Sequence, residues 1–175
     1  MMQDFIDAIE KTVADHINDL HTAIPAEIVD VNYDDGTVDV LPKAKINLAS
    51  GEEIEYPQIN DVPVLFPCGM SKDAVIVYPL NRGDECLLVF CEQSLDYWRS
   101  SGVTSSEMKF SLSNAIAIPG LFAKPTSDIR EAVKNNSIII RNGNKKISLS
   151  KDKITIQGDI EIEGNLTING EIKNK

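Results

Sequence analysis

A six-residue unit repeats three times toward the end of the chain, between Ile154 and Ile172. The three units read ITIQGD, IEIEGN and LTINGE, so each has two aliphatic residues two positions apart, followed by a glycine. This alternation places both aliphatic side chains on one face of a short strand, because successive side chains of a strand point to opposite faces. Glycine permits a sharp backbone corner that larger residues resist. The repeat predicts stacked short strands with corners at Gly158, Gly164 and Gly170.

The repeat is too short to bury its own aliphatic row. A three-sided solenoid of this period needs about 18 residues per turn and several stacked turns, whereas three hexads give about one turn. Three chains winding together would supply the missing neighbours, so we expect a homotrimer with an intertwined triple-stranded β-helix. The predicted trimer core consists of Ile147, Leu149, Ile154, Ile156, Ile160, Ile162, Leu166, Ile168 and Ile172.

Charge is unevenly distributed along the 175 residues, whose formal net charge is −10. Residues 136–175 carry about +2, which leaves residues 1–135 strongly acidic and disfavours a nucleic-acid partner. The hexads themselves have an acidic exterior, provided by Asp159, Glu161, Glu163 and Glu171. There is no apolar run of bilayer length and no basic flank of a signal peptide, so we expect synthesis and retention in a bacterial cytoplasm.

The first 24 residues predict an amphipathic helix over about residues 3–21. Its apolar stripe comprises Phe5, Ile6, Ile9, Val13, Ile17 and Leu20, and its opposite face carries Asp4, Asp7, Glu10, Asp15 and Asp19. Because a helix that lies on a membrane normally carries Lys and Arg on its polar face, this pattern favours docking on protein. His16 and His21 are five positions apart and are expected to be two separate solvated side chains.

Residues 25–122 have the pattern of a small antiparallel barrel of the OB type, built from short β-type runs separated by turns. The first two runs, 26–32 and 37–41, flank an Asp-Asp-Gly turn and predict a hairpin. Further strands are expected at 46–49, 53–56, 62–66, 74–78, 85–91 and about 115–118. The chain is therefore predicted to be mainly β.

Residues 123–136 are expected to link the barrel to a β-helical spike at 137–175. The link contains a predicted short helix over residues 128–134, capped by Ser127. Strands at 137–140 and 146–150 would begin the spike. Ile147 and Leu149 are one residue out of phase with the hexads, so the corner at 151–153 must absorb the extra residue.

Catalytic, cofactor and metal sites are not predicted. Cys68, Cys86 and Cys91 match no metal spacing and are expected to be buried thiols. No histidine lies outside the first helix and no Gly-x-Ser-x-Gly motif occurs, which argues against hydrolase chemistry. The acidic residues at 52, 53 and 55 are expected to form a solvated hairpin edge.

Several short stretches of the barrel region resemble a known family. They are VPVLFP at 62–67, YPLNRGDE at 78–85, SLDYW at 94–98, SLSNA at 111–115 and IPG at 118–120. Together with the hexads, they resemble the central spike proteins of phage contractile tails, the membrane-puncturing, baseplate assembly protein V type. The resemblance covers about residues 25–122 by motif and residues 137–175 by the hexad pattern.

The resemblance implies a trimeric structural protein of a virion tail baseplate or tail-like particle. Its OB domains would sit on baseplate hub and tail tube proteins, and its β-helix would meet the host envelope transiently during membrane puncturing. Phe110 and Asn114 stand where the family often has His and Asp. Many such spikes bind iron through a His-x-His pair at the tip, and no histidine follows His21, so we expect a blunt tip or a separate tip-capping protein.

Two other functions remain open from the sequence. One is a trimeric receptor-binding tail fibre or adhesin module, although such fibres seldom begin with an OB-like domain. The other is a hexapeptide-repeat acyltransferase, which usually has many more hexads and a catalytic histidine in or near the coil.

Overall fold

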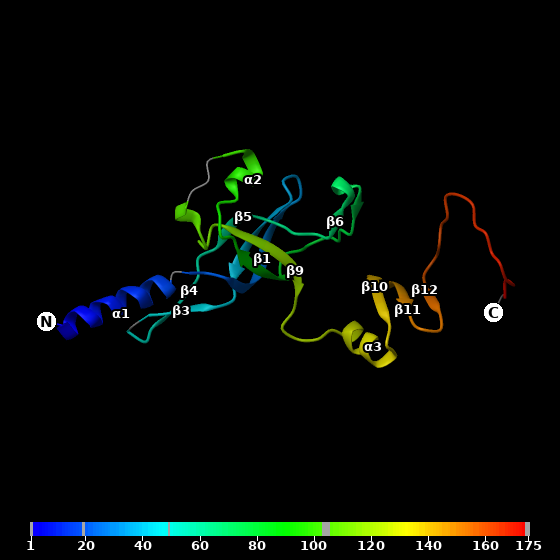
Figure 1. Ribbon diagram of the computed structural model, residues 1–175. Coiled ribbons are helices and arrows are strands. Elements are labelled where there is room, and N and C mark those ends of the chain that lie inside the picture. Colours follow the sequence, from blue (N-terminus) through cyan, green and yellow to red (C-terminus); the bar gives the residue numbers. More distant parts are fainter. Residues whose placement is uncertain (1, 19, 49, 103–105, 174–175) are drawn as a thin grey trace. The chain divides into compact units, whose positions relative to one another are not determined.

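The computed structural model describes residues 2–18, 20–48, 50–102 and 106–173, which form two compact units divided between Phe122 and Ala123 (Figure 1). Asp19 of the predicted acidic helix face, residue 49 of a predicted strand and residues 174–175 of the predicted spike lie outside these ranges.

The first unit begins with the helix α1 (Met2–Asn18). It ends earlier than the predicted residue 21. Beyond its end, the Leu20 N–H donates to the Ile17 carbonyl at 3.2 Å. Asp4 lies in the first turn, where a negative charge interacts favourably with the helix dipole.

A five-stranded antiparallel sheet follows, with the order β5-β2-β1-β8-β9. Its strands are β1 (Ala23–Asn32), β2 (Thr37–Pro42), β5 (Ile59–Pro63), β8 (Glu85–Phe90) and β9 (Ala115–Leu121). The predicted hairpin is confirmed: β1 pairs with β2, and the Asn32 side-chain oxygen accepts from the N–H groups of Asp34 and Asp35 at 3.2 Å each. Gly36 completes the turn at φ 66°, a conformation that glycine adopts without steric cost.

The sheet curls so that its two outer strands approach each other. Just past the end of β5, Val64 forms a parallel bridge with Ala117 of β9, and the Leu65 N–H donates to the Ala117 carbonyl at 2.9 Å. The result is a half-barrel whose inner side holds the hydrophobic core. The core cluster of buried residues consists of Ala26, Ile28, Val38, Val40, Ile59, Val62, Leu80, Cys86, Leu88, Phe90, Ala115 and Ala117.

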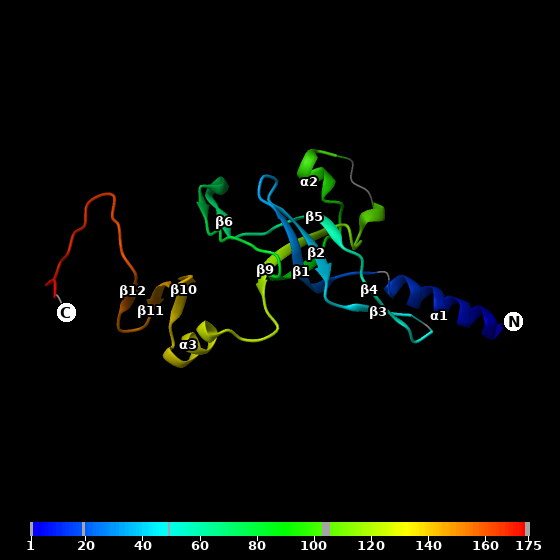
Figure 2. The same cartoon turned by 180° about the vertical axis from the view of Figure 1, so that it is seen from behind.

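Shorter elements lie outside this sheet, and several of them are labelled in Figures 1 and 2. They are the hairpin β3 (Lys45–Asn47) and β4 (Glu53–Glu55), the hairpin β6 (Cys68–Gly69) and β7 (Ala74–Val75), the 3-10 turns η1 (Met70–Lys72) and η2 (Ser106–Met108), and the helix α2 (Asp96–Ser100). The strand predicted at 74–78 is thus only two residues long. The strand predicted at 62–66 is placed too late, since β5 occupies Ile59–Pro63.

The structure corrects two side-chain predictions in this unit. Cys68 is exposed, although Cys86 is buried and Cys91 is half-buried. Burial raises the pKa of the Cys86 thiol to about 11 and also raises the pKa of Cys91, so both thiols stay protonated at neutral pH. His21 is not a solvated side chain, because its ring packs against Phe90 at 5.5 Å and Tyr56 at 5.8 Å between centroids.

The second unit contains α3 (Ser127–Asn135) and an antiparallel sheet of β10 (Ile138–Asn142), β11 (Lys145–Leu149) and β12 (Ile154–Gln157), in the order β10-β11-β12. Ser127 is not the cap of α3. The Thr126 hydroxyl accepts from the Ile129 N–H at 3.4 Å, and Ser127 is the first helical residue. Among residues 158–173, all of which the structure describes, none forms a strand within the single chain.

Candidate self-association surface

The register of the second sheet gathers six aliphatic side chains on one face. Leu149 of β11 lies between its two partners, Ile138 of β10 and Ile154 of β12. Two pairs further along, Ile147 lies between Ile140 and Ile156. Residues directly opposite each other in an antiparallel pair point to the same face, so these residues form two rows of three. We call this set, residues 138, 140, 147, 149, 154 and 156, the aliphatic face.

The turn between β11 and β12 keeps the two strands in phase. The Ser150 N–H donates to the Lys153 carbonyl at 3.0 Å, and the Ser150 hydroxyl donates to the same carbonyl at 3.0 Å. Leu149 and Ile154 are therefore paired even though they are separated by an irregular four-residue loop. The residue that is out of phase with the hexads is accommodated in this loop.

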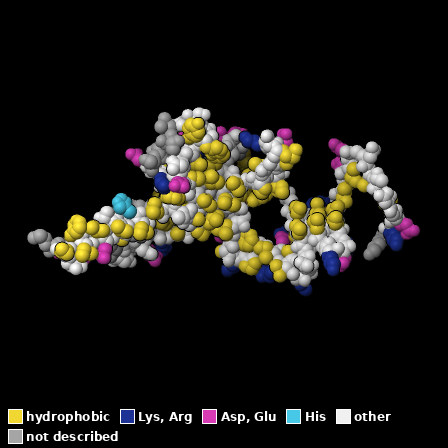
Figure 3. Space-filling view, viewed as in Figure 1, with side chains coloured by type: hydrophobic (Ala, Val, Ile, Leu, Met, Phe, Trp, Pro, Cys, Tyr) yellow, Lys and Arg dark blue, Asp and Glu magenta, His cyan; other side chains and the backbone are white. Residues whose placement is uncertain are grey.

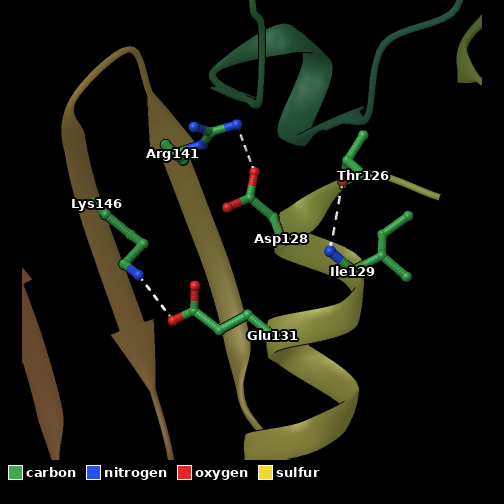
Figure 4. Close-up of polar contacts among 6 residues, drawn as sticks. All are labelled: Thr126, Asp128, Ile129, Glu131, Arg141 and Lys146. Carbon is green, nitrogen blue, oxygen red and sulfur yellow. Dashed lines mark hydrogen bonds and ion pairs between the residues drawn. The ribbon is translucent and has the colours of Figure 1, made fainter.

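The helix α3 lies against the other face of the sheet, as Figure 4 shows. The Asp128 carboxylate pairs with the Arg141 guanidinium at 2.6 Å, and the Glu131 carboxylate pairs with the Lys146 ammonium at 2.8 Å. Arg141 and Lys146 are opposite each other in the register and alternate with the aliphatic residues of their strands. The helix therefore covers the charged face and leaves the aliphatic face open.

Five of the six side chains of the aliphatic face are exposed in the single chain, and the sixth, Leu149, is half-buried. Ile138 and Ile154 are each 66% exposed, and hydrophobic side chains gather over β10–β12 in the space-filling view (Figure 3). No residue described between 123 and 173 is buried, and every residue in 151–173 is exposed. By contrast, the half-barrel buries a hydrophobic core within its own chain. The second unit thus presents apolar surface that its own chain does not cover.

The hexads extend this exposed apolar surface beyond β12. Ile160, Ile162, Leu166, Ile168 and Ile172 are each between 48% and 75% exposed. Gly158 and Gly164 have φ values of 132° and 141°, which L side chains rarely adopt, whereas Gly170 has no such value. Gly158 also lies against the Lys145 side chain, where a Cβ atom would collide with Cδ.

Two residues of the aliphatic face, Ile138 and Ile140, are not predicted from the sequence. The run Ile138-Ile139-Ile140 shows no alternation, so its sequence does not reveal which residues face the same way. The pairing of β10 with β11 assigns Ile138 and Ile140 to the aliphatic face, and Ile139 opposite Ser148 to the other. The sequence signal that could have identified Ile138 and Ile140 is their two-residue spacing, which equals the spacing of Ile147 and Leu149.

A shallow pocket adjoins one end of the aliphatic face. Its lining includes Val133 of α3, Ile138 and Leu149. Ser137 also lines it, and its hydroxyl is buried with no hydrogen-bond partner. This pocket is a small apolar extension of the same uncovered surface.

The described residues show no cluster of three or more His, Cys, Asp or Glu side chains that could hold a metal ion. None of the helices within those residues has the length and apolar character needed to cross a membrane. The exposure of the aliphatic side chains in the second unit provides an uncovered apolar surface, and such surfaces mark sites of association with other molecules.

Comparison with known proteins matches the half-barrel to a protein family. A search of curated proteins found none that matches the chain. Residues 24–120 match the family described as phage protein Gp138 N-terminal domain. This match spans more than half of the 175 residues and covers the five strands of the half-barrel almost from end to end. Because the match spans more than half of the chain and coincides with the curled sheet, the chain belongs to the family of the phage protein Gp138 N-terminal domain.

Proposed function

We propose that this phage structural protein is the central spike of a contractile tail or of a related injection machine. In this proposal the half-barrel is an OB-fold domain that attaches to the baseplate hub and tail tube. Residues 137–175 of three chains form an intertwined β-helix that is driven through the host envelope when the sheath contracts. Membership of a phage protein family and the motifs at 62–120 support the location in a tail.

One observation supports the trimer above all. The aliphatic side chains of the aliphatic face and the hexads are exposed, except for the half-buried Leu149, in a unit without a buried residue among those described. Fully burying one such side chain stabilises a protein by about 1.5–3 kcal/mol, so leaving the whole series in water is unfavourable. Two further copies would cover it with an identical series. They would also pair with the backbone of residues 158–173, which forms no strand within the single chain.

The proposed activity is mechanical and involves no catalytic step. A rod whose strand edges all pair with neighbouring chains, around a dry aliphatic axis, is stiff and transmits force. The acidic residues Asp159, Glu161, Glu163 and Glu171 would lie outside and keep the free trimer soluble. Lys145 forms an ion pair with Asp159 at 3.5 Å, but both side chains are well exposed and the pair adds little stability.

Light scattering on the full chain tests the proposal. A trimer should have three times the 19.3 kDa mass of the chain, about 58 kDa, and should weaken when the chain is truncated after Phe122. A monomeric full chain would overturn the spike function.

The substitution Ile162→Asp tests the axis itself. Three carboxylates near a dry axis should abolish the trimer or its resistance to heat and detergent, because burying an unpaired charge is costly. The matched control is Thr167→Asp, which adds the same charge at a position that alternates with Leu166 and Ile168. If both variants remain equally resistant trimers, the axial assignment is wrong. If a resistant trimer binds intact host cells tightly before any contraction, a receptor-binding fibre is the better function.

A further inference from the structure

The helix α1 presents a second uncovered apolar surface, at the other end of the chain. Phe5 is 66% exposed and Ile17 is 60% exposed, while Ile6, Ile9 and Val13 lie between 41% and 50%. An isolated helix of 17 residues is marginally stable in water, and most helical stability in proteins comes from packing of an apolar face. A helix with this much exposed apolar surface therefore requires a partner.

The spacing of the apolar residues identifies the kind of partner. Met2, Ile6, Ile9 and Val13 are separated by four, three and four residues, and His16 and Leu20 continue with three and four. This is the alternation of the d and a positions of a heptad repeat, with Ile6 and Val13 at a and Met2, Ile9 and His16 at d. Helices with this alternation pack along one seam against helices that carry the same alternation. Leu20 lies just beyond the end of α1, so the seam spans the whole helix.

The polar residues occupy the remaining positions. Asp4 and Lys11 fall at the outermost position of the heptad, and Asp7 falls next to it. The side chain of Gln3, which flanks the seam, donates to the Asp7 carboxylate at 2.9 Å, one turn along the helix. Glu10 also flanks the seam, at the same heptad position as Ile17, whereas Asp4 and Asp7 lie away from it, where these two carboxylates leave packing between helices undisturbed. They also disfavour an anionic lipid surface as the partner.

We propose that α1 packs in parallel with the α1 helices of two other copies of this chain, as a three-helix coiled coil. β-Branched residues at a and at the central d position favour assemblies of more than two helices. Phe5 and Ile17, which flank the seam, widen the apolar stripe beyond what a two-helix seam covers. The number of copies rests on the trimer of the proposed function, in which the second unit independently needs two further chains.

The coiled coil would clamp the trimer through residues 2–18 of each chain, in addition to the clamp that residues 137–175 would form as a β-helix. Linking the chains at one end raises their effective concentration at the other, so each association strengthens the other without a new contact between the units. His16 is the polar layer of the seam. A polar side chain at a core position specifies register at a cost in stability, so His16→Ile should tighten the clamp.

Chemical cross-linking of the full chain tests the proposal. In a Cys68→Ser background, which removes the exposed native thiol, one variant carries Val13→Cys in the seam and a matched variant carries Lys11→Cys on the outer surface. A short bis-maleimide should give covalent dimers from the seam variant in several-fold higher yield than from the outer variant. A tris-maleimide of similar reach should give covalent trimers from the seam variant.

The outcomes separate this proposal from the proposed function. A chain that is monomeric by light scattering overturns both. A trimeric chain in which the two thiols cross-link in equal, low yield overturns the coiled coil and leaves the spike intact. Covalent tetramers or dimers alone from the tris-maleimide would overturn the three-helix packing.

Trypsin provides a second readout that needs no cysteine. Lys11 is the only basic residue before Lys43, so cleavage after Lys11 reports opening of α1. His16→Ile should slow this cleavage several-fold, and Val13→Asp should accelerate it. The control Asp7→Asn, on the outer surface, should leave the rate nearly unchanged. Equal rates for His16→Ile, Val13→Asp and the unaltered chain would show that α1 has no such seam.

Discussion

Asn114 is a buried amide that fixes a loop by satisfying three backbone groups at once. Its side chain is 2% exposed; its oxygen accepts from the Leu95 N–H at 2.9 Å, and its nitrogen donates to the carbonyls of Cys91 and Gln93 at 3.0 and 2.8 Å. An amide is the side chain that supplies an acceptor and two donors in this arrangement. Asn114 thus holds together residues 91–95, immediately before α2.

We expect Asn114→Asp to destabilise the half-barrel by about 3 kcal/mol at neutral pH, because a buried carboxylate would face two carbonyl oxygens and lose both donors. Burial would raise the pKa of the new carboxyl group. The folded state would then bind a proton more readily than the unfolded state, so the loss of stability should shrink as the pH falls toward about 4. Thermal unfolding followed by the fluorescence of Trp98, the single tryptophan, measures this effect. Ser113→Asp is the control, since Ser113 is exposed, and an equal loss in both variants would contradict the role of Asn114.

At the scale of elements, the cost of a side chain at a hexad corner depends more on the backbone conformation of the glycine than on the space around it. Gly158 has φ 132° and Lys145 beside it, whereas Gly170 has neither a positive φ nor an atom within 4 Å of an added Cβ. The same substitution is therefore strained at one corner and free of strain at the other. The three glycines look equivalent in sequence and differ in the folded chain.

Gly158→Ala should destabilise the second unit by about 1–3 kcal/mol per chain, the usual cost of forcing an L residue into a sparsely populated conformation. Gly170→Ala should have an effect close to zero or slightly stabilising. The thermal midpoint of the assembled full chain, measured for both variants, checks the difference. Equal midpoints would mean that the corner at Gly158 is not part of the assembled structure.

Local sequence signals predicted the elements whose structure depends on their own residues. The turn at Asp34–Gly36 is an example, since a side-chain oxygen at Asn32 and a glycine at the corner suffice to form it. The helix α3 was predicted for the same reason, although its cap is Thr126 and not the neighbouring Ser127. Two predictions that depend on residues far away in the sequence were wrong. The exposure of Cys68 and the packing of His21 follow from strands and loops that lie far away in the sequence.

The candidate surface was predictable only in part for a related physical reason. The alternation of Ile147 with Leu149 and of Ile154 with Ile156 shows which residues share a face within each strand. It does not show which strands pair, so Ile138 and Ile140 joined the aliphatic face only through the register of β10 with β11. The later hexads form no strand in the single chain, which leaves the predicted β-helix to be tested by experiments on the assembled protein.

At the scale of the whole molecule, the two units differ in what stabilises their folded structure. The half-barrel buries its own core, whereas the described part of residues 123–175 contains no buried residue. Protection of the first unit should therefore be a property of each chain. Protection of the second unit should follow mass action, because binding between copies stabilises only the associated form.

We expect amide hydrogen exchange in β11 and β12 to slow as the protein concentration rises. Exchange in β1 and β8 should stay slow at every concentration, which provides an internal control within the same sample. Mass spectrometry of peptides covering 145–157 and 85–90 across a dilution series measures both. Exchange in β11 and β12 that is slow and independent of concentration, in a chain shown to be monomeric, would mean that the second unit is stable alone.

The absence of a buried residue among those described after Phe122 also sets an order of events during biosynthesis. The half-barrel lies earlier in the sequence and has all the residues of its core, so it can fold while the remainder of the chain is still being translated. Residues 123–175 follow the half-barrel along the sequence and do not bury a core of their own among the described residues. In the proposed trimer, their apolar side chains would be buried only when copies associate, so the rate of that step would depend on the concentration of the protein in the cell.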